Sequence, residues 1–391
     1  MNFQNQLEIL YLKIINMNNR KARVIAFYLP QYHPTPQNDK FWGKGFTEWT
    51  NVTKAKPLFK GHYQPKLPSD LGFYDLRLPI IREQQAQMAR EAGVEGFMYW
   101  HYWFGDGVMT LQDIFEDVLK SGKPDFPFCL GWANHEWSNK TWTKGKAFQK
   151  DTVIFDMKYP GEKDWIAHFN YCLPAFKDKR YITVDGKPLF YLWQAFRMPD
   201  LKEFIACWQK MAKENGLPGI HFVALWWDDS EFTKESFDRY HDVGIEAINP
   251  AYLTYAEDRA LGSKLHKKIR GLFNRVTLGN FGSIKKFDYK NIIPYLTKEI
   301  DKEDIVYPTI LSGYDRTARS GAKATIYYNY TPELFSKHIK QIIDSVQDKP
   351  FEHRIIFLKS WNEWAEGNYV EPDQKYGHGY LDALRDNIII K

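Results

Sequence analysis

The sequence predicts an α/β protein that folds as a single (β/α)8 barrel, or TIM barrel, with long loops after its strands. Short runs rich in β-branched and aromatic residues alternate with longer amphipathic segments, which is typical of strands followed by helices. Eight such pairs follow one another without an internal repeat or a linker rich in Pro, Gly or Ser. A length of 391 residues also suits a barrel with insertions. A doubly wound open sheet is the alternative fold.

Each expected strand is a short apolar run that ends in polar or aromatic residues. In chain order, the expected strands cover residues 23–28, 96–102, 126–132, 188–193, 221–226, 247–250, 307–312 and 354–360. Because these runs alternate with longer helical patterns, they favour βα units and a parallel sheet.

A helix is expected after each strand. The clearest covers residues 79–92, where Ile80, Ile81 and Met88 lie near helical spacing and Gly93 provides a stop. The other expected helices cover residues 111–121, 163–176, 200–215, 231–241, 289–302, 332–346 and 380–390. We expect residues 21–391 to form the catalytic domain. Residues 1–20 are either a disordered extension or the result of an upstream start, with Met17 as the true one.

Polar and aromatic segments follow six of the expected strands. They are Leu29-Pro30-Gln31-Tyr32-His33, Trp100-His101-Tyr102-Trp103-Phe104, Trp132-Ala133-Asn134-His135-Glu136-Trp137, Trp226-Trp227-Asp228-Asp229, Ser312-Gly313-Tyr314-Asp315-Arg316 and Trp361-Asn362-Glu363-Trp364. In a closed barrel these segments meet at the C-terminal face, where barrel enzymes have their active sites. Aromatic residues make up 17% of the chain, and flat rings can cover the apolar faces of sugars.

These segments predict a carbohydrate site. The residues expected to bind substrate are Tyr32, His33, Glu48, Trp49, Trp100, His101, Tyr102, Trp132, Asn134, Glu136, Trp226, Tyr314, Trp361, Asn362 and Trp364. Glu48 has an equally weighted alternative as a carboxylate that caps a helix or stabilises its loop. The same choice applies to Asn134 and Glu136.

Glu363 and Glu366 are the expected catalytic residues. They lie three positions apart just after the last strand, so a turn or short helix would point both side chains at one pocket. Glycosidic cleavage commonly uses two carboxyl groups, one protonated and one ionised. Burial near Trp361 and Trp364, together with mutual repulsion, would split their pKa values. The alternative is an ordinary Glu-x-x-Glu surface pattern.

Other chemistries find less support. His33, His101 and His135 stand at strand ends, but neither His-x-His nor His-Glu-x-x-His occurs, so we expect no metal. No G-x-S-x-G, G-x-G-x-x-G or P-loop is present, so we expect neither a serine nucleophile nor a cofactor. The net charge of +5 is too small to indicate nucleic-acid binding. Three distant cysteines and the lack of a long apolar run or signal peptide favour a cytoplasmic location.

A basic insertion is expected at about residues 253–287. Residues 259–286 contain eight Lys and Arg residues and no acidic ones. The segment is expected to be a solvated loop with a short amphipathic helix. The alternative is peripheral contact with a membrane or a lipid-linked glycan.

Four stretches resemble the WbsX family, which is often labelled glycosyltransferase and is associated with surface-polysaccharide gene clusters. The stretches are Ala26-Phe27-Tyr28-Leu29-Pro30-Gln31-Tyr32-His33, Trp42-Gly43-Lys44-Gly45-Phe46-Thr47-Glu48-Trp49, Tyr99-Trp100-His101-Tyr102-Trp103-Phe104 and Trp361-Asn362-Glu363-Trp364-Ala365-Glu366-Gly367. That family is in turn similar to glycoside hydrolase family 99, the endo-α-mannosidases and endomannanases, which are (β/α)8 barrels.

The resemblance implies a retaining mechanism without metal. Glu363 matches the carboxylate that acts as base on the sugar's own 2-hydroxyl, which attacks the anomeric carbon and forms an anhydro-sugar. Glu366 matches the general acid and base. The chain differs from the hydrolases at Ala365, where they tend to have histidine, and from the WbsX pattern at His135-Glu136.

Three functions therefore compete. The first is a retaining glycoside hydrolase, endo-α-mannosidase-like, or a transglycosylase that acts on a bacterial surface polysaccharide or its precursor. The second is a glycosyltransferase of O-antigen or capsule polysaccharide biosynthesis, including lipopolysaccharide. The third is a non-catalytic glycan-binding barrel. All three take an oligosaccharide or polysaccharide as partner.

Overall fold

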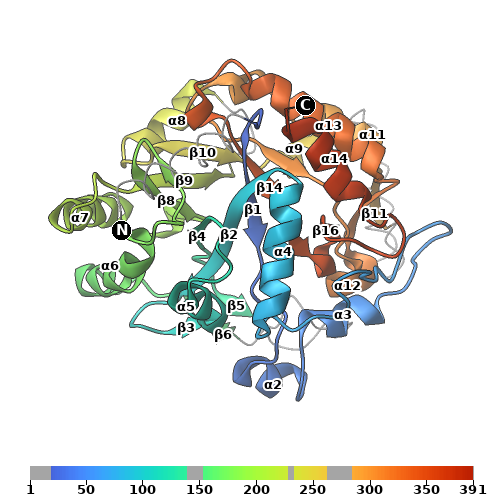
Figure 1. Ribbon diagram of the computed structural model, residues 1–391, viewed down its shortest axis with the longest axis horizontal. Helices are drawn as coiled ribbons and strands as arrows, with labels where there is room; N and C mark the ends of the chain where they lie inside the picture. Colours follow the sequence, from blue (N-terminus) through green and yellow to red (C-terminus); the bar gives the residue numbers. More distant parts are fainter. Residues whose placement is uncertain (1–18, 139–152, 228–232, 262–283, 391) are drawn as a thin grey trace, which may run out of the picture.

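The computed structural model describes residues 19–138, 153–227, 233–261 and 284–390. Eight parallel strands form its central sheet (Figure 1). They are β1 Arg23–Tyr28, β2 Val94–Trp103, β4 Phe128–Trp132, β8 Lys187–Leu192, β9 His221–Trp226, β10 Ala247–Pro250, β12 Thr309–Leu311 and β14 Ile355–Lys359. Each of the eight overlaps a strand that the sequence predicts.

The order of the strands makes the sheet a nearly closed barrel. From β1, the sheet runs through β2, β4, β8 and β9 to β10 on one side, and through β14 to β12 on the other. A parallel bridge between Ile248 and Val306 links the two ends. There the backbone N–H of Ile248 donates to the carbonyl of Ile305, and that of Tyr307 donates to the carbonyl of Ile248, both at 2.8 Å. The predicted (β/α)8 barrel is confirmed.

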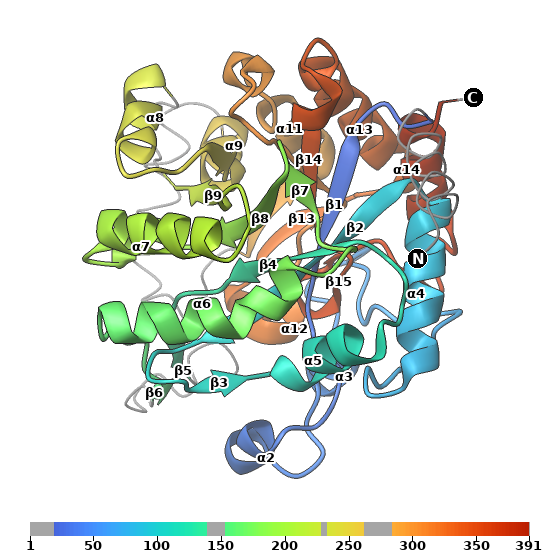
Figure 2. The same cartoon turned by 60° about the vertical axis from the view of Figure 1, so that its left-hand side comes forward.

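Helices cover the outside of the barrel, as Figures 1 and 2 show from two directions. They are α4 Pro79–Glu91, α5 Gln112–Ser121, α6 Glu162–Phe176, α7 Leu201–Glu214, α8 Lys234–His241, α13 Pro332–Val346 and α14 Gly379–Ile388. Helix α13 illustrates why they form. The Thr331 hydroxyl accepts from the N–H of Leu334, Pro332 occupies the first turn, and residues such as Phe335 and Ile339 form a buried stripe.

The prediction of one helix over residues 289–302 is wrong. The segment instead contains α11 Tyr289–Ile292 and two 3-10 helices, η3 Ile293–Tyr295 and η4 Glu299–Lys302. Pro294 explains the break, because it has no N–H to donate and restricts the residue before it.

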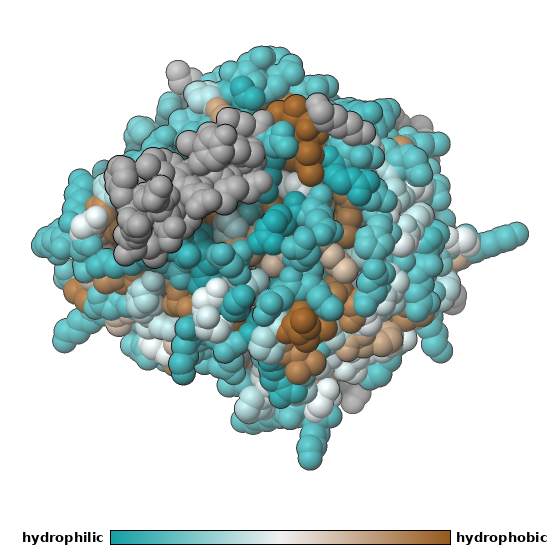
Figure 3. Space-filling model, in the orientation of Figure 1, coloured by the Kyte–Doolittle hydropathy of each residue, from teal (hydrophilic) through white to brown (hydrophobic). Residues whose placement is uncertain are grey.

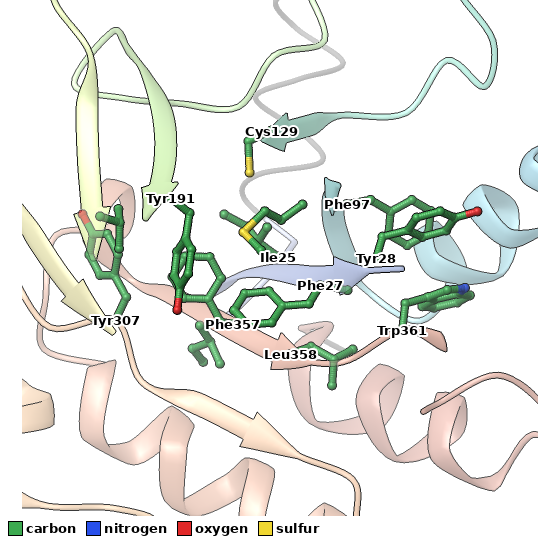
Figure 4. Close-up of a cluster of buried hydrophobic side chains, with 14 of the residues drawn as sticks. Ile25, Phe27, Tyr28, Phe97, Cys129, Tyr191, Tyr307, Phe357, Leu358 and Trp361 are labelled. Carbon is green, nitrogen blue, oxygen red and sulfur yellow. The ribbon is translucent and has the colours of Figure 1, made fainter. Parts of the chain in front are cut away.

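The core joins the barrel interior to the mouth of the barrel. Phe27 points inward between Tyr191 and Phe357, with ring centroids 5.3 Å from each, as Figure 4 shows. The next residue, Tyr28, points to the other face of the sheet and packs on Phe97 at 4.9 Å. This alternation follows from strand geometry. The inward face of β1 therefore supplies both packing and the floor of the cavity described below.

Long loops at the C-terminal ends of the strands carry short elements. After β1 come α2 Pro36–Trp42 and α3 Glu48–Lys54, and after β12 come α12 Thr317–Ser320 and β13 Thr325–Tyr328. The expected basic insertion begins as α9 Leu253–Ala260 and ends in β11 Lys285–Asp288, which pairs with β13. Its central part, residues 262–283, lies outside the described residues, as does most of the expected extension 1–20.

Among the helices that the structure describes, none combines the length and apolar character needed to cross a bilayer. The face in Figure 3 is largely hydrophilic, with small, separate apolar areas.

Candidate active site

A cavity of about 470 Å³ opens at the C-terminal end of the barrel. Its size lies within the range of small-molecule sites. The aromatic side chains in its lining are Phe27, Trp42, Trp100, Tyr102, Trp137, Trp193, Trp227 and Tyr314. Its charged lining residues are Glu136, Glu257, Lys285, Arg316, Arg319, Lys359, Glu363 and Glu366. The lining thus combines rings that can stack on sugars with groups that can transfer protons.

The two predicted carboxylates reach this cavity through a tight hairpin. After β14, the chain forms β15 Asn362–Glu363, a 3-10 turn η7 Trp364–Glu366, and β16 Asn368–Tyr369, which pairs antiparallel with β15. Gly367 makes the reversal possible with a φ of 61°. A Cβ at this position would lie 2.9 Å from the Cβ of Asp315. Both the conformation and the close approach therefore require glycine.

Asn362 and Tyr32 fasten the hairpin to the end of β1. The Asn362 side chain accepts from the N–H of Leu29 at 2.8 Å and donates to the carbonyl of Leu29 at 3.1 Å. The Tyr32 hydroxyl donates to the carbonyl of Asn362 at 2.5 Å and accepts from the N–H of Trp364 at 3.2 Å. Both side chains are buried, so they position the motif from behind and do not line the cavity.

A buried carboxylate, Glu371, holds the two tryptophans of the motif. It accepts hydrogen bonds from the indole N–H groups of Trp361 at 2.9 Å and Trp364 at 2.6 Å. It also accepts from the Tyr74 hydroxyl at 2.8 Å and the Gln85 amide at 2.6 Å. Burial raises the pKa of Glu371 to about 7, although these four donors oppose the shift. Trp361 and Trp364 are buried anchors rather than the walls of the pocket that the sequence predicts.

Arg319, from α12, lies between three carboxylates. Its Nη1 donates to Glu366 at 2.5 Å, and its Nη2 donates to Glu363 at 3.0 Å and to Glu48 at 3.1 Å. Arg316 adds a second cation 3.4 Å from Glu366. Three acidic side chains can approach one another in a buried site only because a cation lies between them.

The surroundings separate the proton affinities of the three carboxyl groups. Burial raises the pKa of Glu48 to about 8, helped by Glu363 and opposed by Arg319. Burial also raises the pKa of Glu363, helped by the charge of Glu366. At Glu366, burial acts in the same direction, but the charges of Arg319, Arg316 and Lys359 outweigh it and lower the pKa. The site therefore favours a protonated carboxyl next to an ionised one, as acid–base catalysis requires.

The structure brings some predicted residues to the cavity and places others behind it. The predicted residues that line the cavity are Trp100, Tyr102, Glu136, Tyr314, Glu363 and Glu366. Glu48 is linked to Glu363 and Glu366 through Arg319 but is fully buried. The predicted residues that are buried without lining the cavity are Tyr32, His33, Trp49, His101, Trp132, Asn134, Trp226, Trp361, Asn362 and Trp364. These buried side chains pack against neighbouring segments behind the cavity wall.

Asn134 and Trp49 show what these buried residues do instead. The Asn134 side chain accepts from the N–H of Gln194 at 2.7 Å and donates to its carbonyl at 2.8 Å, which joins the loops after β4 and β8. Trp49 donates to the carbonyl of Tyr74 at 2.9 Å and packs on Trp364 at 5.5 Å. Both make contacts that fix loop positions.

His101 points away from the cavity, between β2 and α6. Its Nε2 lies 2.8 Å from Nε2 of His168, so one ring donates and the other accepts. Burial lowers the pKa of His101 to about 3, which keeps it neutral. Cys172 lies next to the pair, and the three potential metal-ligand atoms are within 4.8 Å of one another. Burial also raises the pKa of the Cys172 thiol.

Sequence reasoning missed several residues of the site. Arg319 lies three residues beyond the polar segment that follows the seventh strand, and nothing in the local pattern distinguishes it from a surface arginine. Lys359 did carry a signal, since a lysine ends the otherwise apolar strand β14. Its Nζ lies 5.5 Å from the ring centroid of Trp193, another cavity residue. Glu371 had no recognisable signal.

The chain is similar to known proteins in sequence and in fold. A family model described as glycosyltransferase WbsX matches residues 24–384. Two relatives from Xanthomonas campestris pv. campestris (strains B100 and ATCC 33913), each named "Uncharacterized protein WxcX", are 31% and 30% identical over 367 residues. The matches cover 93% of this chain and 49% of those proteins, so this chain spans about half the length of either relative.

Solved structures support the fold. A "Glycoside hydrolase-like protein" aligns with a TM-score of 0.60 at 14% identity, covering 95% of each chain. The GH99 endo-alpha-mannosidase from Bacteroides thetaiotaomicron aligns with a TM-score of 0.54 at 14% identity, covering 93% of this chain and 95% of the other. At this identity the likeness is one of architecture. The match to the family model extends over most of the chain, and the chain belongs to the WbsX glycosyltransferase family.

Proposed function

We propose that this protein is a retaining glycoside hydrolase, endo-α-mannosidase-like, or a transglycosylase that acts on a bacterial surface polysaccharide or its precursor. The observation that carries the proposal is that Glu363 and Glu366 share the guanidinium group of Arg319 at the wall of a sugar-sized cavity. Aromatic rings such as Trp100 and Trp193 offer stacking surfaces in the same cavity.

The pair supports glycosidic bond cleavage because the two groups differ in proton affinity. One carboxyl must protonate the leaving oxygen while the other acts as a base. In the scheme that the family resemblance implies, Glu363 takes the proton of the sugar's 2-hydroxyl, whose oxygen attacks the anomeric carbon. Glu366 protonates the leaving oxygen and then takes a proton from the water, or the acceptor hydroxyl, that attacks the anomeric carbon. The bond from that carbon to the 2-oxygen breaks, and the 2-oxygen regains its proton from Glu363.

The directions of the pKa shifts favour the opposite assignment, in which Glu363 is the acid and Glu366 is the base. The pKa of Glu363 is raised and that of Glu366 is lowered by the nearby arginines. The dependence of the cleavage rate on the leaving group distinguishes the two assignments. Replacing the acid spares substrates with a good leaving group, whereas replacing the base does not.

The proposal is tested by digesting mannose-, rhamnose- and fucose-containing bacterial polysaccharides with the purified protein. Mass spectrometry should detect new reducing ends, or new transfer products, that a Glu363→Gln/Glu366→Gln double variant does not form. Binding of a glycan without any product, in the presence of water and an acceptor sugar, would instead favour a non-catalytic binding barrel.

A glycosyltransferase is the second candidate, because the matching family model carries that description. A transferase of this kind needs an activated donor. Thermal-shift measurements with a set of nucleotide sugars separate the candidates: the proposed hydrolase should show no stabilisation, whereas a nucleotide-dependent transferase should be stabilised by its donor.

A further inference from the structure

A small side chamber opens from the main cavity near Lys359. Its volume is about 40 Å³, against about 470 Å³ for the main cavity. The residues that line both spaces are Phe27, Trp193, Trp227, Leu253 and Lys359. Burial lowers the pKa of Lys359, whereas the charges of Glu366 and Glu363 raise it. This lysine of the side chamber therefore lies in the electrostatic field of both carboxylates.

The wall of the side chamber is mainly apolar. The apolar residues that line the side chamber but not the main cavity are Leu225, Pro250, Ala251, Leu296 and Leu311, which come from the ends of β9, β10 and β12 and from the segment after η3. Because these side chains offer no hydrogen bonds, water in the side chamber finds few partners there. When an apolar group of a ligand displaces such a poorly held water molecule, the binding affinity increases.

Asn249, a polar residue of the side-chamber lining, forms its side-chain hydrogen bonds within the protein. The Asn249 amide donates to the carbonyl of Tyr307 at 2.6 Å and to the Thr309 hydroxyl at 2.8 Å. Its oxygen accepts from the Tyr191 hydroxyl at 2.9 Å. A sugar hydroxyl placed here would lose its water contacts without equal replacement, which costs about 1–3 kcal/mol.

We propose that the side chamber receives a methyl-bearing substituent of the substrate sugar, either the methyl of a 6-deoxyhexose or the methyl of an acetyl group. The space exceeds that of one water molecule but is far smaller than the main cavity, so it suits a substituent rather than a whole ring. This inference rests on the proposed function, because it assumes that a sugar occupies the main cavity.

The experiment compares matched monosaccharides that differ only in this group. The pairs are D-rhamnose with D-mannose, L-fucose with L-galactose, and N-acetyl-D-glucosamine with N-formyl-D-glucosamine. Binding is measured by ligand-observed NMR and calorimetry in the Glu366→Gln background, so that turnover does not interfere. We expect the methyl-bearing member of at least one pair to bind about tenfold more tightly or better. The deoxy pairs and the acetyl pair distinguish the two sources of the methyl group.

Filling the side chamber should remove this preference. Ala251→Leu places a larger side chain in the wall, and Leu296→Phe serves as a second variant if the first does not fold. Ala167→Leu, the same change on the exposed face of α6, should leave the preference intact.

The outcomes separate the two proposals. Glycans that bind with no preference for the methyl-bearing member, or a preference that survives in the filled variants, would overturn the side-chamber assignment and leave the proposed function standing. If no glycan of any kind binds, the proposed function fails and this inference fails with it.

Discussion

The guanidinium group of Arg319 donates hydrogen bonds to three glutamate side chains that belong to different parts of the chain. Glu48 precedes it by 271 residues, and Glu363 and Glu366 follow it by 44 and 47. With Arg319 only 9% exposed, little water is available to replace its charge. Breaking such a buried pair typically costs about 3–5 kcal/mol, because the remaining charges are uncompensated.

We therefore expect Arg319→Met to lower the free energy of unfolding more at pH 8 than at pH 5. Without the cation, the pKa values of the three glutamates rise, so the folded protein retains protons that the unfolded chain releases. Urea unfolding at the two pH values measures this difference. Arg319→Lys keeps the charge and should lie between the variant and the wild type. An equal loss at both pH values would show that Arg319 acts by packing alone.

Glu48 gives a second prediction at the scale of single residues. Its pKa is raised to about 8 in the folded protein, above the ordinary value of 4.5. Its stabilising contribution is thus present below pH 4.5 and is lost as the pH rises toward 8. The loss is at most about 1.4 kcal/mol per pH unit.

The test compares unfolding free energies of the wild type and Glu48→Gln between pH 4.5 and 8. The wild type should lose stability over this window, and the variant should lose less. Glu371, with a pKa of about 7, also makes the free energy of unfolding fall with pH. It does so in both proteins, so its contribution cancels in the comparison. Parallel curves would contradict the assignment of a protonated Glu48.

Among the structural elements, the hairpin of β15, η7 and β16 determines where the side chains of Glu363 and Glu366 point. The Asp315 N–H donates to the carbonyl of Glu366 at 2.6 Å, which ties the hairpin to the loop after β12. Asp315 in turn accepts hydrogen bonds from His62, Gln64 and Lys66 at 2.7–2.8 Å. The position of Glu366 thus depends on loops from three strands.

Gly367→Ala should displace this hairpin. The added Cβ would lie 2.9 Å from Asp315 and 3.0 Å from Nζ of Lys66, in addition to the strain of a φ of 61°. Gly377→Ala is the matched control, since Gly377 has a φ of 53° and nothing within 4 Å of an added Cβ. In thermal unfolding, Gly377→Ala should lower the free energy of unfolding by about 1 kcal/mol. Gly367→Ala should lower it by about 1–3 kcal/mol more than that.

Activity on a cleavable glycan should fall in Gly367→Ala and persist in Gly377→Ala. If the two variants behaved alike in both measurements, close packing against Asp315 would not be what fixes Glu366. The comparison separates backbone strain, which both variants share, from the clash that only one of them has.

At the scale of the whole molecule, the fold could be predicted because its signals are local. Each strand is an apolar run within a few residues, and strand order follows from the closure of a parallel barrel. Glu363 and Glu366 could be found for the same reason, since they lie in one short motif at the end of β14. Placing the motif at the barrel mouth required only the count of strands.

The rest of the site depends on contacts that no local pattern reveals. Arg319 reaches its partners over tens to hundreds of residues, and Glu371 is recognisable only once the indoles of Trp361 and Trp364 are seen to point at it. His101 was expected in the cavity because it lies near the end of an expected strand, but its side chain faces His168 on α6. A strand-end position does not by itself say which face a side chain occupies.

The central claim is that Glu363 and Glu366 together carry out the reaction on the glycan. The measurement that tests it most directly is kcat/KM on a cleaved glycan for Glu363→Gln and Glu366→Gln, with circular dichroism to verify folding. Glu333→Gln, on the exposed surface of α13, is the control. The account predicts a loss of about 10²–10⁴-fold for each active-site variant and unchanged turnover for the control. A folded Glu363→Gln or Glu366→Gln protein with wild-type kcat/KM would contradict it.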